Sequence, residues 1–343
     1  MPLVQLTSGQ RNVLEKQQYR FVGSHSAVKV CYWTKSMMKN EGGCYKFVFY
    51  GIRSHQCLQM TTSLFCANRC TFCWRGQKAP VSESWYGPID EPSHIIKHAI
   101  DAHLGLLVGL EGNDKVPKRM KEEYRSMRHV ALSLTGEPIT YPRLNELLEE
   151  FHRRKISTFL VTNAQFPEAI ENIKNVTQLY LSVDAPTQDL LKDIDRPLFK
   201  DYYERLLKSL DAAARKKFRT CIRLTIIKGK NDLHPEGYAE LIKRGDPDFI
   251  EVKAYMHVGA SLIYHSKEQS PEHSHVKAFA LELLNHLPEY ELVSEHLPSK
   301  VVLLVKKEAL PYRFIDFQKF FEIVNSGGEA KIEDYGSKKM MAN

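Results

Sequence analysis

From about residue 57 onward, short apolar runs alternate with longer segments whose apolar residues recur at helical spacing. The runs predict strands and the longer segments predict helices. Six strand-then-helix units of this kind follow one another up to about residue 290. The predicted strands are 57–66, 129–138, 157–163, 178–186, 219–229 and 248–256.

Strands that alternate with helices predict a parallel sheet and an α/β fold. Six units are too few for an eightfold barrel, so we expect a partial (β/α)6 barrel or a doubly wound sheet. Residues 1–56 lack the rhythm and are expected to form an N-terminal extension before a barrel of residues 57–290. A C-terminal extension, 291–343, is expected to hold an apolar run at a sheet edge (300–308) and an amphipathic helix (313–324).

The chain of 343 residues is 43% apolar, which is enough for a buried core. No run of 18 apolar residues and no signal-peptide core occur, so we expect a cytoplasmic protein without a membrane partner. The net charge of +7 is compatible with a polyanionic partner but does not require one.

Six of the seven cysteines lie between residues 31 and 73, and in a cytoplasmic chain this favours metal ligation over disulfides. Cys66, Cys70 and Cys73 form the pattern C-x3-C-x2-C. Soft thiolates suit an iron–sulfur cluster or zinc. A [4Fe–4S] cluster on three thiolates leaves one iron open, whereas zinc would need a fourth ligand such as Cys57.

Cys31, Cys44 and Cys57 are separated by 12 residues each and indicate a second [4Fe–4S] cluster with an open iron. Two alternatives remain open: a zinc site completed by His55, and three unrelated cysteines.

The segment "CANRCTFC", with Phe72 before its last cysteine, resembles the signature of the radical S-adenosylmethionine (SAM) superfamily. The resemblance implies that the open iron of the Cys66, Cys70 and Cys73 cluster binds SAM and that the fold is a (β/α) barrel. The segment "LTGEP" is similar to the superfamily motif that contacts the SAM amino group. It supplies the predicted SAM-binding residues Thr135, Gly136, Glu137 and Pro138.

Short polar residues at successive strand ends suit a ribose and a carboxylate, although each alone is also typical of a helix cap. They are Asn163, Ser182 and Asp184. The segment 223–232 resembles the part of the superfamily that packs on adenine and ribose, which makes Arg223 and Asn231 candidate SAM contacts.

The double cysteine arrangement resembles the tRNA 4-demethylwyosine synthase family over essentially the whole chain. The most specific segments are "SLFCANRCTFCWR", "LSLTGEPITYPRL", "TNAQFP" and "LSVDAPT". The resemblance implies conversion of N1-methylguanosine, 3′ of the anticodon of tRNA-Phe, to 4-demethylwyosine with pyruvate as two-carbon donor. It also implies the compact archaeal form: a monomer that takes electrons from a separate flavodoxin- or ferredoxin-like donor.

Pyruvate has two candidate binding modes. It can chelate the open iron of the second cluster, or it can form a Schiff base with Lys46 in "GCYKF". Lys46 has two simpler interpretations, as a surface lysine or as a partner of the pyruvate carboxylate. Two other functions remain open: a different radical SAM enzyme with an auxiliary cluster, and a zinc-stapled nucleic-acid-binding protein.

Overall fold

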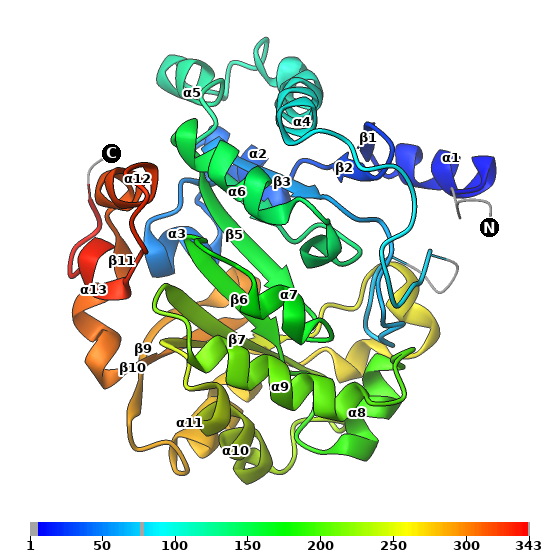
Figure 1. The fold of residues 1–343 in the computed structure, drawn as a ribbon, viewed down its shortest axis with the longest axis vertical. Helices are drawn as coiled ribbons and strands as arrows, with labels where there is room; N and C mark the ends of the chain where they lie inside the picture. The colour runs from blue at the N-terminus through cyan, green and yellow to red at the C-terminus, as the bar shows by residue number, and fades with distance from the viewer. Residues whose placement is uncertain (1–5, 76–78, 342–343) are drawn as a thin grey trace.

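Six parallel strands form the centre of the computed structural model, which describes residues 6–75 and 79–341 (Figure 1). They are β3 (Cys57–Thr61), β4 (His129–Leu132), β5 (Ser157–Thr162), β6 (Gln178–Ser182), β7 (Arg219–Ile226) and β8 (Phe249–Ala254). Each strand pairs in parallel with the next one along the chain. Parallel neighbours need a crossover, and each crossover here carries a helix. The expected partial (β/α)6 barrel is confirmed.

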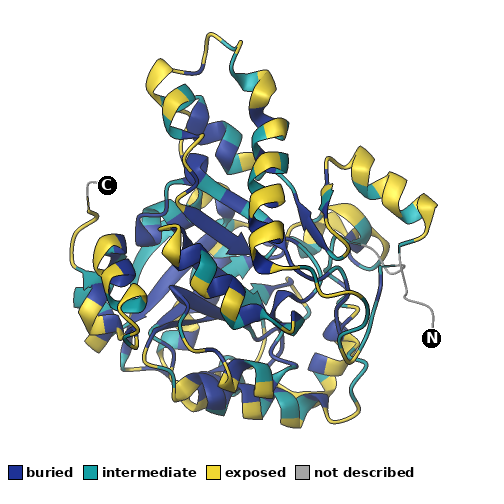
Figure 2. Cartoon of the chain, turned by 45° about the horizontal axis from the view of Figure 1, so that its top comes forward, coloured by how far each residue is buried: buried dark blue, intermediate teal, exposed yellow. Residues whose placement is uncertain are grey.

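The crossover helices cover the outer face of the sheet with their apolar sides (Figures 1 and 2). They are α4 (Pro92–Leu107), α6 (Leu144–Arg153), α7 (Pro167–Glu171), α8 (Gln188–Asp195), α9 (Tyr202–Ala214), α10 (Pro235–Gly245) and α11 (His273–Leu284). In α6 the buried residues Leu144, Leu147, Leu148 and Phe151 lie on one helical stripe. Stripes of this kind explain why the helical periodicity was readable in the sequence.

Both terminal extensions add strands to the same sheet. On one side β1 (Arg20–Val22) and β2 (Ser26–Val28) form a hairpin that joins β3. On the other side β10 (Val301–Lys306) lies antiparallel between β8 and the edge strand β9 (Tyr290–His296). The prediction that 300–308 lies at the edge was therefore wrong by one strand. The domain boundaries after residues 56 and 290 fall within this continuous sheet and stay a prediction.

Strands β3 and β4 both end earlier than predicted. At the end of β3, threonine hydroxyls bond to backbone carbonyls in the place of further ladder bonds. The Thr61 hydroxyl donates to the Ser63 carbonyl at 2.7 Å, and the Thr62 hydroxyl donates to the Pro138 carbonyl at 2.9 Å. Cys66 therefore lies in a loop beyond β3 and does not close the strand.

The remaining described elements lie around this barrel. At the N-terminal side they are α1 (Ser8–Lys16), α2 (Tyr32–Met38), α3 (Tyr45–Tyr50) and, further along, α5 (Lys118–Glu123); at the C-terminal side they are β11 (Phe314–Ile315), α12 (Phe317–Asn325), α13 (Ile332–Tyr335) and β12 (Gly336–Ser337). Helix α12 is the helix predicted at 313–324; it begins later because the Asp316 side chain caps it by accepting from the Lys319 amide. Within the described ranges, no helix is long and apolar enough to cross a membrane.

Candidate active site

The loop that follows β3 carries the C-x3-C-x2-C pattern in residues 66–73 and is called the signature loop below. It brings the thiols of Cys66, Cys70 and Cys73 close enough for their charges to interact. Burial raises the pKa of Cys66 to about 12 and also raises the pKa of Cys70. Such thiols stay protonated unless a cationic group takes the place of the proton. Cys66 is buried, and Cys70 and Cys73 are partly buried on the same loop. Three neighbouring thiols of this kind fit the three protein ligands of an iron–sulfur cluster.

Two sets of hydrogen bonds hold the signature loop in place. Arg75 donates to the carbonyl oxygens of Leu64 (3.2 Å), Pro80 (3.2 Å) and Asn68 (3.0 Å). The Asn68 amide donates to Asp195 Oδ2 at 3.2 Å, so the loop is also tied to the end of α8. Burial raises the pKa of Asp195 to about 7, and hydrogen bonds from Cys70 and Asn68 oppose that shift.

The Gly-Glu-Pro turn lies against the same loop. Gly136 has φ +65°, and a Cβ there would lie 1.9 Å from the Ser63 carbonyl oxygen. Glu137 follows it and is buried; its Oε2 accepts from the Asn163 amide at 3.0 Å. Its Oε1 has no partner among the described residues, and burial raises the pKa of Glu137 to about 7. A buried acceptor without a partner fits the ammonium group of SAM.

The predicted residues at the next strand ends lie in the same region. The side-chain amide of Asn163 donates to Cys66 Sγ at 3.3 Å, which joins the end of β5 to the signature loop. Asp184 is buried, and burial and then the charge of Asp195 raise its pKa. Ser182 is partly exposed in the barrel interior, Phe72 packs against the core, and Thr135 lines a 670 Å³ hollow together with Leu64 and Arg75.

Two of the predicted SAM contacts have other partners. Asn231 is fully buried, and its side chain bonds to backbone groups: it donates to the Asp184 (2.7 Å) and Thr225 (2.8 Å) carbonyls and accepts from the Ile227 backbone N–H (2.6 Å). We therefore expect it to shape the loop after β7. Arg223 donates to Glu251 at 2.9 Å and to the Tyr45 hydroxyl at 2.9 Å, which places it beside Lys46.

The thiols of Cys31, Cys44 and Cys57, the second cysteine triplet, also lie within electrostatic reach of one another. Cys31 and Cys44 directly precede α2 and α3, and Cys57 begins β3. Burial raises the pKa of Cys31 and brings that of Cys57 to about 12; the charge of Cys44 acts on both. Tertiary packing thus brings the three thiols within electrostatic reach of one another, and their role as ligands of one cluster stays a prediction.

The two zinc alternatives stand differently in this geometry. His55 Nε2 bonds Glu123 at 2.8 Å, but His55 Nδ1 is buried and has no partner among the described residues, so the Glu123 bond does not occupy both ring nitrogens. Cys57 begins the strand whose far end precedes Cys66, which places it away from the signature loop. Five extended residues separate strand ends by about 15 Å. Within residues 6–75 and 79–341, no three His, Cys, Asp or Glu side chains converge on one point that could hold a single ion. A cubane cluster differs, since each thiolate binds its own iron.

Lys46 lies inside the protein, with 8% of its surface exposed, so the interpretation as a surface lysine was wrong. Its Nζ lies 4.6 Å from the ring centroid of Tyr180 and 5.6 Å from that of Phe159. Burial, and then the charge of Arg223, lower the pKa of Lys46. Cys57 and Cys44 are also within electrostatic reach. The lysine and the second cysteine triplet therefore share one site.

The residues that face the barrel interior are identified by their exposure in the central strands. Helices cover the outside, so a partly exposed residue in a central strand faces the interior. These residues share one face in the strand register: Ser182 pairs with Arg223, which pairs with Glu251, and Thr225 pairs with Lys253. The partly exposed set comprises Cys57, Gln59, Val161, Ser182, Arg223, Thr225 and Lys253.

Sequence reasoning missed four residues of this region: Arg75, Asp195, Glu251 and Lys253. Asp195 and Arg75 carry no motif. Glu251 and Lys253 do have a signal, because each is a charged residue at an interior-facing position of the otherwise apolar strand β8. Burial of charge in a strand that is covered by helices indicates a functional interior.

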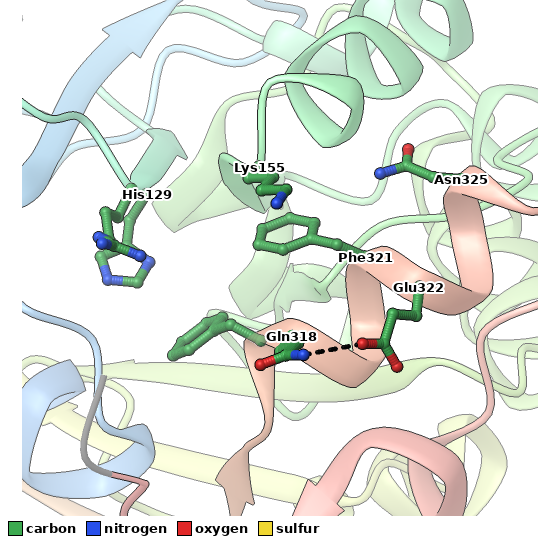
Figure 3. Close-up of a pocket in the computed structure, with 8 residues that line it drawn as sticks. His129, Lys155, Gln318, Phe321, Glu322 and Asn325 are labelled. Atoms are coloured by element: carbon green, nitrogen blue, oxygen red, sulfur yellow. Dashed lines mark hydrogen bonds between the residues drawn. The ribbon is translucent and has the colours of Figure 1, made fainter.

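A second hollow lies at the opposite end of the barrel (Figure 3). It measures 610 Å³ and is lined by α12 and by residues that directly precede or begin β4 and β5, namely Arg128, His129 and Lys155. Phe321 lies beneath Lys155 there, and Gln318 donates to Glu322 at 2.9 Å (Figure 3). Because the signature loop and the Gly-Glu-Pro turn follow the carboxyl ends of the strands, this hollow lies at the other end of the barrel from the predicted SAM-binding residues.

Two family models match the chain in adjacent ranges. Residues 60–242 match the model described as the radical SAM superfamily, and residues 244–306 match the one described as wyosine base formation. The chain is 48% identical over 332 residues to the S-adenosyl-L-methionine-dependent tRNA 4-demethylwyosine synthase of Oryza sativa, covering 95% of this chain and 51% of that protein. It is 45% identical over 339 residues to the synthase TYW1 of Homo sapiens, covering 97% and 46%. The chain thus spans about half the length of the curated relatives it matches.

Two solved structures match over nearly their full length. One is described as TYW1 with a lysine-pyruvate adduct bound; it has a TM-score of 0.81 and 35% identity, and the match covers 91% of this chain and 99% of that one. The other is described as archaeal TYW1, with a TM-score of 0.73 and 33% identity over 88% and 97% of the two chains.

Proposed function

Because this chain belongs to the radical SAM superfamily and, within it, to the TYW1 family, we propose that it converts N1-methylguanosine in tRNA-Phe to 4-demethylwyosine with pyruvate as carbon donor. The observation that carries the proposal is Lys46, a buried lysine of lowered pKa beside the second cysteine triplet. One solved TYW1 structure is described with a lysine-pyruvate adduct, and the burial and lowered pKa of Lys46 suit it to form such an adduct.

Cys66, Cys70 and Cys73 would hold one [4Fe–4S] cluster, and Glu137 would accept the SAM ammonium. When bound, this cluster and SAM supply the deoxyadenosyl radical that removes a hydrogen from the N-methyl group. The side-chain amide of Asn163 donates to Cys66 Sγ, and its backbone N–H donates to Glu137 Oε2. Asn163 therefore fixes the position of Cys66 relative to Glu137. The second triplet, Cys31, Cys44 and Cys57, would hold a second cluster; its thiols and their burial support that assignment.

Lys46 acts on pyruvate as a nucleophile. Burial favours its neutral amine, whose nitrogen bonds to C2 of pyruvate while the C2 oxygen leaves as water with both amine protons. The methylene radical of the base then bonds to C2, which moves the unpaired electron to the lysine nitrogen. The C1–C2 bond breaks next, so that C1 leaves as the carbon dioxide radical anion with the unpaired electron and the C2–N double bond to Lys46 is restored. Finally the guanine amino group replaces Lys46 on C2, which closes the ring and frees the lysine. Chelation of pyruvate by an open iron of the second cluster is compatible with the same position.

Three further features belong to the proposal and await tests: a tRNA partner, a separate flavodoxin- or ferredoxin-like electron donor, and a monomeric state. The net charge of +7 supports the tRNA partner, since phosphate contacts need Lys and Arg.

Borohydride trapping tests the role of Lys46. Anaerobically reconstituted protein is incubated with pyruvate and borohydride, and the adduct is located by peptide mass. Wild type should carry it at Lys46, while Lys46→Arg should lose both the adduct and the modified nucleoside but still cleave SAM. Lys118→Arg, on the exposed helix α5, is the matched control and should behave as wild type. Full product formation by Lys46→Arg would refute the Schiff base.

A further inference from the structure

Lys253 lines the same interior as Lys46. It lies on β8 at the position that pairs with Thr225, two residues beyond Glu251, and is partly exposed. Residues two apart in a strand point to the same face and lie about 6.6 Å apart. Arg223 and Glu251 act electrostatically on both lysines. The Arg223–Glu251 pair is therefore within electrostatic reach of both lysines.

Glu251 has charged and polar partners in this interior, whereas Lys253 has no carboxylate partner in the part of the chain that the structure describes. Arg223 contacts Glu251 Oε2 at 2.8 Å, and the Tyr50 hydroxyl donates to Glu251 Oε1 at 3.0 Å, so this carboxylate already has its partners. Lys253 Nζ donates only to the carbonyls of Ser299 (3.3 Å) and Ala254 (3.5 Å), and no carboxylate of the described chain lies within ion-pair distance. Two long bonds to carbonyl oxygens leave an enclosed ammonium without a counter-ion.

An enclosed ammonium without a counter-ion is an incomplete site. Burial, followed by the charge of Arg223, lowers the pKa of Lys253 to about 8, which shows how poorly the surrounding protein groups support this charge. An anion bound there would restore the balance. The substrate proposed for Lys46 is such an anion, and its carboxylate is attached directly to the carbonyl carbon that Lys46 attacks.

We propose that Lys253 binds the carboxylate of the α-keto acid while Lys46 attacks its carbonyl carbon. This inference rests on the proposed function, because it takes Lys46 as the nucleophile. Lys46 Nζ lies 4.6 Å from the ring centroid of Tyr180, and Lys253 lies on the interior-facing side of β8. A short α-keto acid between them presents one functional group to each lysine. Lys253 is thus a residue that selects α-keto acids over simple ketones and aldehydes.

The test compares pyruvate with methyl pyruvate, which keeps the carbonyl but lacks the negative charge. Trapping at Lys46 is measured against the concentration of each compound in wild type, Lys253→Met, Lys253→Gln and Lys253→Arg. Removing a charged hydrogen bond should raise the half-saturating pyruvate concentration roughly 10- to 100-fold in the neutral variants. Lys253→Arg should stay within several-fold of wild type. With methyl pyruvate all four proteins should have the same half-saturation.

Controls separate binding from folding and from the proposed function. Lys300→Met removes a neighbouring cation that is paired with Glu272 at 3.0 Å and should change little. SAM cleavage without pyruvate should be unchanged in each Lys253 variant. Unchanged pyruvate half-saturation in both neutral variants, an equal shift with methyl pyruvate, or a shift in the KM for tRNA instead would each overturn the inference. Absence of any adduct in wild type would refute the Schiff base itself.

Discussion

Gly136 offers a direct test of how tightly the Gly-Glu-Pro turn is packed on the signature loop. The Gly136→Ala substitution should lower the free energy of unfolding for two reasons. Its φ of +65° costs an L-residue about 1–2 kcal/mol. Its Cβ would lie 1.9 Å from the Ser63 carbonyl oxygen and 2.8 Å from the Ser63 carbonyl carbon, and overpacking of this kind costs about 1–3 kcal/mol. We expect a total loss of roughly 2–5 kcal/mol in the free energy of unfolding.

Two other glycines separate these contributions. Gly229 has φ +71°, and a Cβ added there would have nothing within 4 Å, so Gly229→Ala should show only the conformational cost. Gly105 lies within α4 and also has open space, so Gly105→Ala should stabilise the protein by about 0.5–1 kcal/mol. The three variants make the same chemical change in three different environments.

The assay is urea unfolding of the metal-free protein, followed by circular dichroism. The expected order of stability is Gly105→Ala, wild type, Gly229→Ala and then Gly136→Ala. Iron content after reconstitution should fall only in Gly136→Ala, because only there must the signature loop move. If Gly136→Ala is as stable as Gly229→Ala, the Ser63 backbone yields and close packing is not the reason for the glycine.

Two further variants probe the barrel and the loop. Burial lowers the pKa of His129 to about 3, against about 6.5 when unfolded, so its stabilising effect is complete above pH 6.5 and is lost as the pH falls toward 3. His129→Gln should therefore reduce the fall in unfolding free energy between pH 7 and pH 5 by about 2 kcal/mol, whereas exposed His94→Gln should not; equal acid sensitivity of both variants would contradict this. Arg75→Lys cannot reproduce three bonds to the loop carbonyls and should lower the iron bound per chain, while the exposed Arg69→Lys should not; equal iron content would show that the loop holds without Arg75.

Features that are local in the chain were predictable. The six strands and the helices that cover them were found from periodicity, because burial of one face imposes a repeating pattern on neighbouring residues. Strand ends were predicted less well: β3 stops at Thr61 because side chains of the following residues, such as Thr62, replace the ladder bonds. The hairpin of β1 and β2 was missed since strands of three residues each are too short to show a period.

The sequence by itself determined the composition of the first thiol cluster, because Cys66, Cys70 and Cys73 lie within eight residues and one loop can present them together in almost any fold. The surroundings of Lys46, by contrast, depend on how the chain folds in three dimensions. Arg223, Glu251 and Lys253 reach that interior from β7 and β8, some 200 residues away, through strand pairings that no local pattern encodes. The tertiary structure also placed Arg223, a predicted SAM contact, against Glu251 and Tyr45. Periodicity reports which face of a strand is buried, whereas the meeting of charges across a barrel depends on register and closure.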